Sequence, residues 1–211
     1  MSLTPAHFPQ LIAAVTDTIN RHAEAVTELD QAIGDGDHVY NLQRGLKALQ
    51  EAETEISQLS WPAAWQKIGM ILMSQVGGAS GSLYATLFLS LSKQAAQAKT
   101  ADQNFASAFT AAIEAVKQRG KADVGEKTML DVWVPVAEAL TTASNTKQSL
   151  PTILTAVEQA AEAGVEATRN MIATKGRASF LGERSVGHID AGAKTAQLMV
   201  SALVNCIRQL P

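Results

Sequence analysis

The sequence is poor in cysteine. Its single cysteine, Cys206, cannot form an intramolecular disulfide and cannot supply a cysteine-rich zinc site. Such a composition is typical of proteins in a reducing compartment, so we expect a cytoplasmic location.

Long hydrophobic runs and an excess of positive charge are also missing. No run of about 18 apolar residues is present, and Met1 to Asn20 lacks the basic start and apolar core of a signal peptide. Lysine and arginine together number 17 and aspartate and glutamate 20, which gives a net charge of −3. This balance leaves no broad basic face for nonspecific binding of nucleic acid. We therefore expect no membrane and no nucleic acid among the partners.

The sequence is rich in alanine, and its apolar residues recur mostly at the spacing of an α-helix. Apolar residues recur at helical spacing after Thr4-Pro5, an N-cap followed by an N1 proline, and again in the last stretch before Leu210. Alanine is the strongest helix former, whereas β-branched residues alternating at period two are nearly absent. We predict one all-α domain of about eight helices over residues 1–211. Between the two terminal helices we expect helices over residues 40–54, 61–74, 82–98, 102–119, 129–144 and 151–173, with Pro135 kinking or splitting one of them.

Four segments rich in Gly, Asp, Ser and Arg interrupt this pattern: residues 30–38, 76–81, 119–128 and 175–192. Loops that only connect the helices of a bundle are usually short, so the last segment in particular needs another explanation. All four are candidates for functional residues.

The first segment places Asp30, Asp35 and Asp37 on a turn made flexible by Gly34 and Gly36. Three carboxylates repel one another unless a cation compensates, and hard oxygen ligands suit Mg²⁺ or Ca²⁺. The alternative is that these are solvated loop aspartates, with Asp37 capping the next helix. An EF-hand is disfavoured, because its last ligand position would hold an asparagine instead of a glutamate.

The second segment, Gly77-Gly78-Ala79-Ser80-Gly81, can turn several backbone N–H groups toward one point at a helix start. The helix dipole also favours an anion there, so a phosphate would fit. The alternative is a tight helix–helix connection. A dinucleotide-binding fingerprint is disfavoured, since the preceding residues have helical and not strand periodicity.

The third segment almost spells a P-loop, with Gly120 followed after four residues by Gly125-Glu126-Lys127-Thr128. Glu126 stands between the glycine and the lysine, and no strand precedes the segment. An acidic residue inside a phosphate cradle would repel the ligand, so we reject this interpretation.

The fourth segment carries Arg177 and Arg184, whose guanidinium groups suit phosphate. Taken alone, both are more typical of surface ion-pair partners, and His38 and His188 are more typical of hydrogen-bonded structural histidines. Cys206, on an apolar helical face, is expected in the core. In combination, three carboxylates, a glycine cradle and loop arginines favour a polyphosphate site at one end of a helical barrel.

Taken in order, these segments resemble the nucleotide-binding subunit of dihydroxyacetone kinase, in the stand-alone DhaL form used with the bacterial phosphotransferase system. The resemblance covers nearly the whole chain. The motifs that carry it are Gly34-Asp-Gly-Asp-His38 with Asn41, Gly77 to Gly81, Lys127-Thr-Met-Leu-Asp131, and Gly176-Arg-Ala-Ser179 with Gly182-Glu-Arg-Ser185 and Gly187-His188.

The resemblance implies an antiparallel barrel of eight helices that binds ADP or ATP through two Mg²⁺ ions at its loop end. In this family the aspartates matching Asp30, Asp35 and Asp37 hold the metals. The arginine matching Arg177 contacts the nucleotide and acts as the catalytic residue beside the transferring phosphate. The other positions that match nucleotide contacts are His38, Val39, Tyr40, Asn41, Ala79, Ser80, Gly120, Met129, Asp190, Ala191 and Gly192.

The chain departs from the family pattern at two places. Val39-Tyr40 replaces a small Gly-X pair, which adds bulk close to the phosphates, and Ala191 replaces a proline, which removes a rigid turn. Neither change touches a metal ligand, so we expect nucleotide binding to survive both.

The resemblance also implies partner subunits, because a chain of this length leaves no room for the domain that binds the ketose. They are a dihydroxyacetone-binding kinase subunit and a phosphotransferase-system subunit that donates the phosphoryl group. The sequence leaves three alternatives open: a homodimer, another small ketose as acceptor, and a regulatory coactivator that binds nucleotide without kinase turnover.

Overall fold

The structure is a computed structural model that describes residues 3–97 and 105–210. Its described part contains helices and no strands, which confirms the predicted all-α class. Short 3-10 helices accompany the α-helices: η1 (Pro5–His7), η2 (Thr168–Asn170) and η3 (Arg177–Ser185). The α-helices are α1 (Phe8–Arg21), α2 (Ala23–Ile33), α3 (His38–Glu51), α4 (Glu53–Ser57), α5 (Trp61–Gln75), α6 (Gly78–Gln97), α7 (Phe105–Gly120), α8 (Leu130–Asn145), α9 (Leu150–Ala167) and α10 (Ala191–Gln209).

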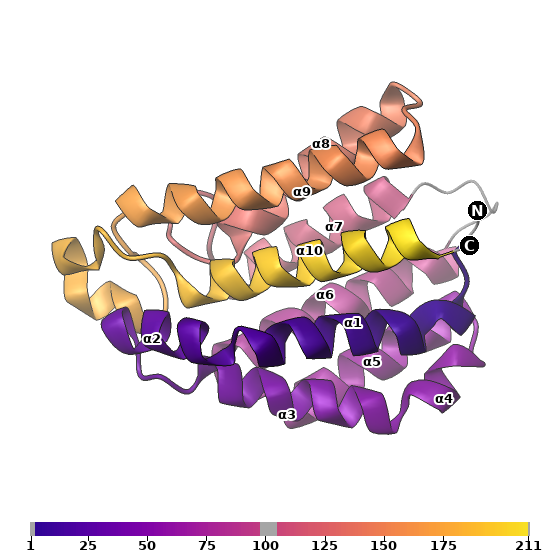
Figure 1. The fold of residues 1–211 in the computed structure, drawn as a ribbon, viewed down its shortest axis with the longest axis horizontal. Helices are drawn as coiled ribbons and strands as arrows, with labels where there is room; N and C mark the ends of the chain where they lie inside the picture. The colour runs from indigo at the N-terminus through magenta and orange to yellow at the C-terminus, as the bar shows by residue number, and fades with distance from the viewer. Residues whose placement is uncertain (1–2, 98–104, 211) are drawn as a thin grey trace.

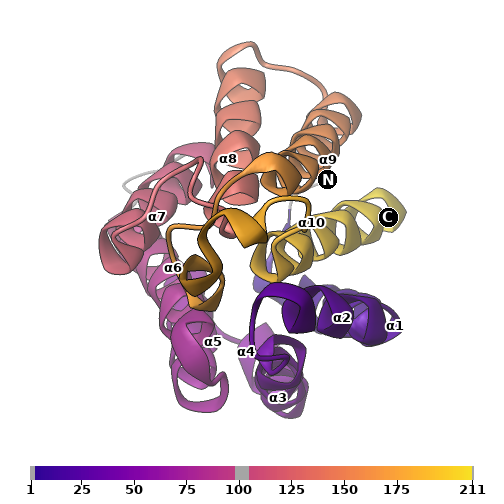
Figure 2. The ribbon, with the colours of Figure 1, turned by 90° about the vertical axis from the view of Figure 1, so that its left-hand side faces the viewer.

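The helices form a closed ring. Neighbours pack in the order α1, α3, α5, α6, α7, α8, α9 and α10, and α10 packs back against α1 (Figure 2). Because α2 follows α1 with only His22 between them, and α4 is a short continuation of α3, the ring has eight members. Successive members run in opposite directions along the long axis (Figure 1). The fold is therefore an antiparallel helical barrel.

Small residues allow α10 to pack tightly among its neighbours. Ala193 and Ala196 have no exposed surface, and Ala202 is also buried. The first helix instead follows ordinary amphipathic spacing, with Ile12 and Ile19 on its buried face. The barrel core thus contains many alanine and aliphatic side chains, together with a few aromatic ones such as Phe109 and Trp133.

Several element boundaries differ from the sequence-based expectations. Helix α6 begins at Gly78 and includes most of the glycine turn, and α9 ends at Ala167 because the chain continues through 3-10 turns. Helix α8 runs through Pro135, so that helix is not split. Cys206 is only partly buried instead of lying in the core. The expected helix ends at residues 98 and 102–104 lie outside the described residues.

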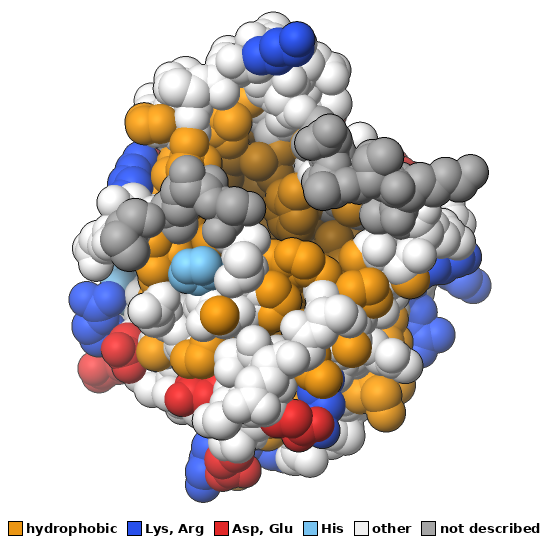
Figure 3. All heavy atoms as spheres, turned by 90° about the vertical axis from the view of Figure 1, so that its right-hand side faces the viewer, with side chains coloured by type: hydrophobic (Ala, Val, Ile, Leu, Met, Phe, Trp, Pro, Cys, Tyr) orange, Lys and Arg blue, Asp and Glu red, His pale blue; other side chains and the backbone are white. Residues whose placement is uncertain are grey.

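All four interrupting segments lie at one end of the barrel. They connect α2 to α3, α5 to α6, α7 to α8 and α9 to α10, and the antiparallel order brings these connections together (Figure 2). The opposite end shows hydrophobic side chains around a central hollow (Figure 3). The loop end is therefore where the candidate functional residues gather.

None of the helices within the described ranges combines the length and the apolar character needed to cross a bilayer.

Candidate functional site

Three carboxylates converge at the connection between α2 and α3. One oxygen from each of Asp30, Asp35 and Asp37 lies within 4.8 Å of the others. A Cβ added at Gly34 would stand 2.2 Å from an Asp30 carboxylate oxygen, so this turn closes only around a glycine. Carboxylate oxygens crowded in this way repel one another, and they are the ligands that Mg²⁺ prefers. The donor set therefore fits a divalent cation.

Arg177, from η3, lies against this acid cluster. Its Nε atom is 2.9 Å from Asp35 Oδ2, and 73% of its side chain is exposed. An ion pair this exposed contributes little stability by itself. Among the residues that the structure describes, no lysine or arginine forms an ion pair with Asp30 or Asp37. Arg184, in the same 3-10 helix, is exposed.

His38 begins α3 and joins the acid cluster to α10. Its backbone N–H donates to Asp30 Oδ2 at 3.1 Å, and its Nε2 lies 2.9 Å from the Thr195 hydroxyl. That hydroxyl donates to the Gly192 carbonyl, so His38 is the donor to Thr195. Burial lowers the pKa of His38, although Asp30 and Asp37 act in the opposite direction. His38 is thus a hydrogen-bonded histidine that links two helices, as the structural interpretation expects.

The next three residues of α3 point in different directions. Val39 is buried in the main hydrophobic cluster, whereas 66% of Tyr40 is exposed. The side chain of Val39 therefore packs in the core and does not add bulk beside the acid cluster. Asn41 is buried, and a Cβ added at Gly77 would lie 2.6 Å from its Oδ1 atom. The start of α3 consequently lies beside the glycine turn.

The glycine turn forms the N-terminus of α6. Gly78 has a φ of +67°, and Ala79 and Ser80 belong to the first helical turn. At Gly81 an added Cβ would be 2.1 Å from the Val76 carbonyl oxygen, so only glycine permits this approach of α5 to α6. The N–H groups of a first helical turn have no partner inside the helix. This geometry fits an anion.

The remaining predicted residues lie at the end of α7 and at the starts of α8 and α10. Gly120 ends α7 next to Leu83 of α6, and Met129 precedes α8. A Cβ added at Gly192 would lie 3.8 Å from the Met129 nitrogen, so α10 starts beside α8. Ala191 and Met129 are both buried, with 5% and 7% of their surface exposed.

Asp190 caps α10, with its side chain accepting from the Ala193 N–H at 2.7 Å. Burial raises the pKa of Asp190 to about 7, while the Ala193 N–H and Lys127 act to lower it. Burial likewise raises the pKa of the nearby Tyr84 phenol to about 12. The inner wall beneath the loop end is therefore poorly solvated.

Sequence reasoning gave no role to two residues that shape these connections, although it quoted Asp131 as the end of a family motif. Thr195 receives the His38 hydrogen bond, and nothing in a helical pattern distinguishes it from other threonines. Asp131 accepts from the N–H groups of Gly125 and Thr128 at 2.6 and 2.7 Å, which fixes the loop before α8. Asp131 could have been recognised from its place in the first turn of a helix, where an acidic side chain can accept from free backbone N–H groups.

The structure is an all-α barrel whose loop end gathers the acid cluster, the N-terminus of α6 and Arg177, groups whose chemistry fits a cation and an anion. Comparison with known proteins agrees with this class: residues 32–205 match the DAK2 domain family. The chain belongs to this family.

Comparison with individual relatives shows which members of the family the chain resembles. The chain is 41% identical over 189 residues to the "PEP-dependent dihydroxyacetone kinase 1, ADP-binding subunit DhaL" of Listeria innocua, with 89% of each chain covered. It is 39% identical to the corresponding subunit of Escherichia coli K12, over 96% of this chain and 97% of that one. The chain therefore belongs to the DhaL-type subunits of dihydroxyacetone kinases, which are phosphotransferases.

A solved structure shares the fold. The dihydroxyacetone kinase of C. freundii, crystallised with AMP-PNP and Mg²⁺, superposes with a TM-score of 0.74 at 24% identity. The match covers 97% of this chain and 34% of the larger one. The same helical barrel is therefore built into a longer kinase chain.

Proposed function

We propose that this chain holds ADP or ATP through two Mg²⁺ ions and transfers the terminal phosphoryl group to dihydroxyacetone bound on a partner subunit. The observation that carries the proposal is the convergence of Asp30, Asp35 and Asp37 within 4.8 Å, with Arg177 against one of them.

The charge balance supports two divalent ions. Three carboxylates and a nucleoside diphosphate bring together roughly six negative charges, which two divalent ions and Arg177 largely offset. Mg²⁺ bound there would supply positive charge that offsets the negative charge developing on the phosphates. Asp30, Asp35 and Asp37 are the residues that would hold it.

The other predicted residues have distinct roles in this proposal. The first turn of α6, with Ala79 and Ser80, offers backbone N–H groups to phosphate oxygens. Arg177 stabilises the moving phosphoryl group as a preorganised positive charge. No side-chain nucleophile is needed, because positioning and electrostatics supply most of the catalysis in phosphoryl transfer.

The nucleobase would lie farther along the loop end. Gly120 carries no side chain at the end of α7, and Met129, of which 7% is exposed, would offer the soft apolar edge of its side chain to one face of adenine. His38 to Asn41 would lie along the nucleotide, and Asp190 to Gly192 would close over it at the start of α10.

The proposed partners follow from the relatives. Those of Listeria innocua and Escherichia coli are named PEP-dependent, and that of Lactococcus lactis, 40% identical, is named PTS-dependent. We therefore assign the phosphoryl donor to a phosphotransferase-system subunit that recharges bound ADP. The ketose would bind to a second kinase subunit.

A mixing assay tests this function. ADP-loaded chain, the cognate ketose-binding subunit and the phosphorylated donor should together yield dihydroxyacetone phosphate, and omission of any one should abolish it. Tight ADP binding without product in the complete mixture would instead favour the regulatory alternative.

A further inference from the structure

The connection between α9 and α10 leaves the barrel and returns to it across the loop end. We call residues 170–186 the arginine loop, because this segment carries Arg177. In Figure 2 the loop, in gold, lies over the middle of the ring of helices. Its two ends meet where the Gly187 N–H donates to the Arg169 carbonyl at 2.8 Å and the Asp190 N–H donates to the Thr168 hydroxyl at 3.1 Å.

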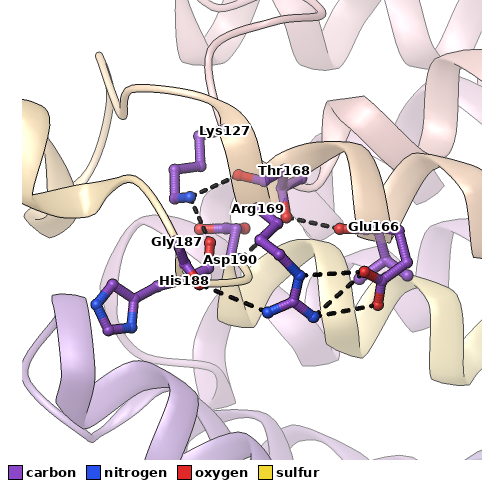
Figure 4. Close-up of polar contacts among 8 residues, drawn as sticks. Lys127, Glu166, Thr168, Arg169, Gly187, His188 and Asp190 are labelled. Carbon is purple, nitrogen blue, oxygen red and sulfur yellow. Dashed lines mark hydrogen bonds and ion pairs between the residues drawn. The ribbon is translucent and has the colours of Figure 1, made fainter.

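Lys127 ties these two ends together from inside the protein. Its side chain is 1% exposed, and its Nζ donates to the carbonyl oxygens of Thr168 and His188, each at 2.5 Å (Figure 4). A lysine is almost never fully buried unless its charge is compensated by partners. Here two carbonyls from opposite ends of one loop accept its hydrogen bonds, and the carboxyl groups of Asp190 and Asp131 act on its charge.

Glu126, the preceding residue, holds the loop at a second point. Its Oε1 accepts from the Thr174 hydroxyl at 2.8 Å and pairs with Lys175 Nζ at 3.4 Å, just before Arg177. Its backbone carbonyl accepts from the Thr174 N–H at 3.4 Å. Two adjacent residues of the segment that resembles a P-loop therefore both face the arginine loop.

The other contacts of the arginine loop are internal hydrogen bonds and one small apolar cluster. Ser185 Oγ accepts from the Ala173 N–H at 2.9 Å and donates to the Gly182 carbonyl at 2.6 Å. Ala173 and Ala178 pack with Ile33 of α2 in a cluster of three buried residues. The Arg177–Asp35 ion pair is exposed and thus weak by itself. These contacts keep the shape of the loop and pack it on α2, whereas Glu126 and Lys127 fasten it to the connection before α8.

We propose that Glu126 and Lys127 are positioning residues for phosphoryl transfer: they anchor the arginine loop so that Arg177 lies over the acid cluster. This inference rests on the proposed function for its catalytic consequence, while the anchoring itself is independent of it. Displacing a catalytic group by about 1 Å can cost roughly 100-fold in rate.

Hydrogen–deuterium exchange on the isolated chain tests the anchoring. K127M removes the ammonium and E126A removes the carboxylate, and in both variants peptides within residues 168–188 should exchange faster, while α1 and α5 stay protected. K121M is the matched control, since Lys121 lies in the same connection with a positive φ but is exposed. Unchanged exchange of the arginine loop in the two variants would overturn the proposal. If K127M does not fold, E126A decides alone.

A double-mutant cycle in the mixing assay tests the catalytic consequence. Each single variant should lower kcat by about 10- to 100-fold, with little change in the KM for the ketose-bearing subunit. Combined with R177A, either change should cost almost nothing further, because it acts through Arg177. Multiplicative losses would refute positioning through Arg177. Absence of transfer by the unmutated chain refutes the proposed function instead, and the exchange experiment still decides the anchoring.

Discussion

Arg177 Nε lies 2.9 Å from Asp35 Oδ2, although the two residues belong to connections at opposite ends of the sequence. The barrel closes α10 against α1 and α2, which brings the last connection over the first. An arginine is thereby placed beside the carboxylates that we assign to Mg²⁺. Because the pair is exposed, Arg177 can exchange Asp35 for a phosphate oxygen at little cost.

Removal of Arg177 should impair transfer more than binding. We expect R177A to lower phosphoryl transfer in the complete mixture by about 100- to 1,000-fold, as found when a preorganised donor to a developing charge is lost. Its affinity for Mg-ADP, measured by calorimetry, should change by only a few fold. R184A is the control, since Arg184 is an exposed arginine of the same 3-10 helix. Equal losses in R177A and R184A would contradict a catalytic role.

Removal of one carboxylate should abolish metal-dependent binding. D35N keeps the shape of the side chain but removes a charge from the acid cluster, so Mg²⁺-dependent ADP binding should be lost. D123N should bind normally, because Asp123 is an exposed aspartate of another connection at the same end that pairs with Lys117. Calorimetric titration of ADP with and without Mg²⁺ makes the comparison. Unchanged binding by D35N would refute the metal assignment.

Asp190 should make stability depend on pH. Burial raises its pKa from 3.8 to about 7, so between these values the folded state holds a proton that the unfolded state releases. The stabilisation from this group is full at low pH and is lost as the pH rises toward about 7. D190N keeps a good N-cap but cannot titrate.

Urea unfolding of both proteins across this pH range measures the effect. The free energy of unfolding of the unmutated chain should fall relative to that of D190N as the pH rises, and the difference should become constant above pH 8 or so. A difference that does not vary with pH would show that Asp190 is ionised throughout.

The isolated chain should not be a complete kinase. Purified protein supplied with ATP, Mg²⁺ and dihydroxyacetone should form no dihydroxyacetone phosphate, because we assign the ketose to another subunit. Coupled detection of the product checks this. Robust turnover by the chain alone would place the ketose site on this chain and contradict the proposal.

The sequence was informative where the determinants are local. Asp30, Asp35 and Asp37 lie in one short turn, so their spacing was enough to predict that they converge. Alanine content and helical period likewise predicted the all-α class. Boundaries were less predictable, since a 3-10 continuation after α9 and a helix that starts inside a glycine turn depend on packing with neighbours.

Long-range contacts explain what sequence reasoning could not reach. A lysine between a glutamate and a threonine is expected at the surface, and the burial of Lys127 depends on carbonyls of Thr168 and His188 from a distant segment. The role of Thr195 similarly depends on His38, which begins α3 and lies 157 residues earlier in the chain. Neither contact has a local pattern that would indicate it.

The central claim is that the acid cluster holds the nucleotide through two divalent ions. A crystal structure with ADP and Mn²⁺, using the anomalous signal of manganese, tests it most directly. We predict two anomalous peaks within ligand distance of Asp30, Asp35 and Asp37, with the phosphates between these peaks and the first turn of α6. ADP bound without manganese at these carboxylates, or bound elsewhere on the barrel, would contradict the account.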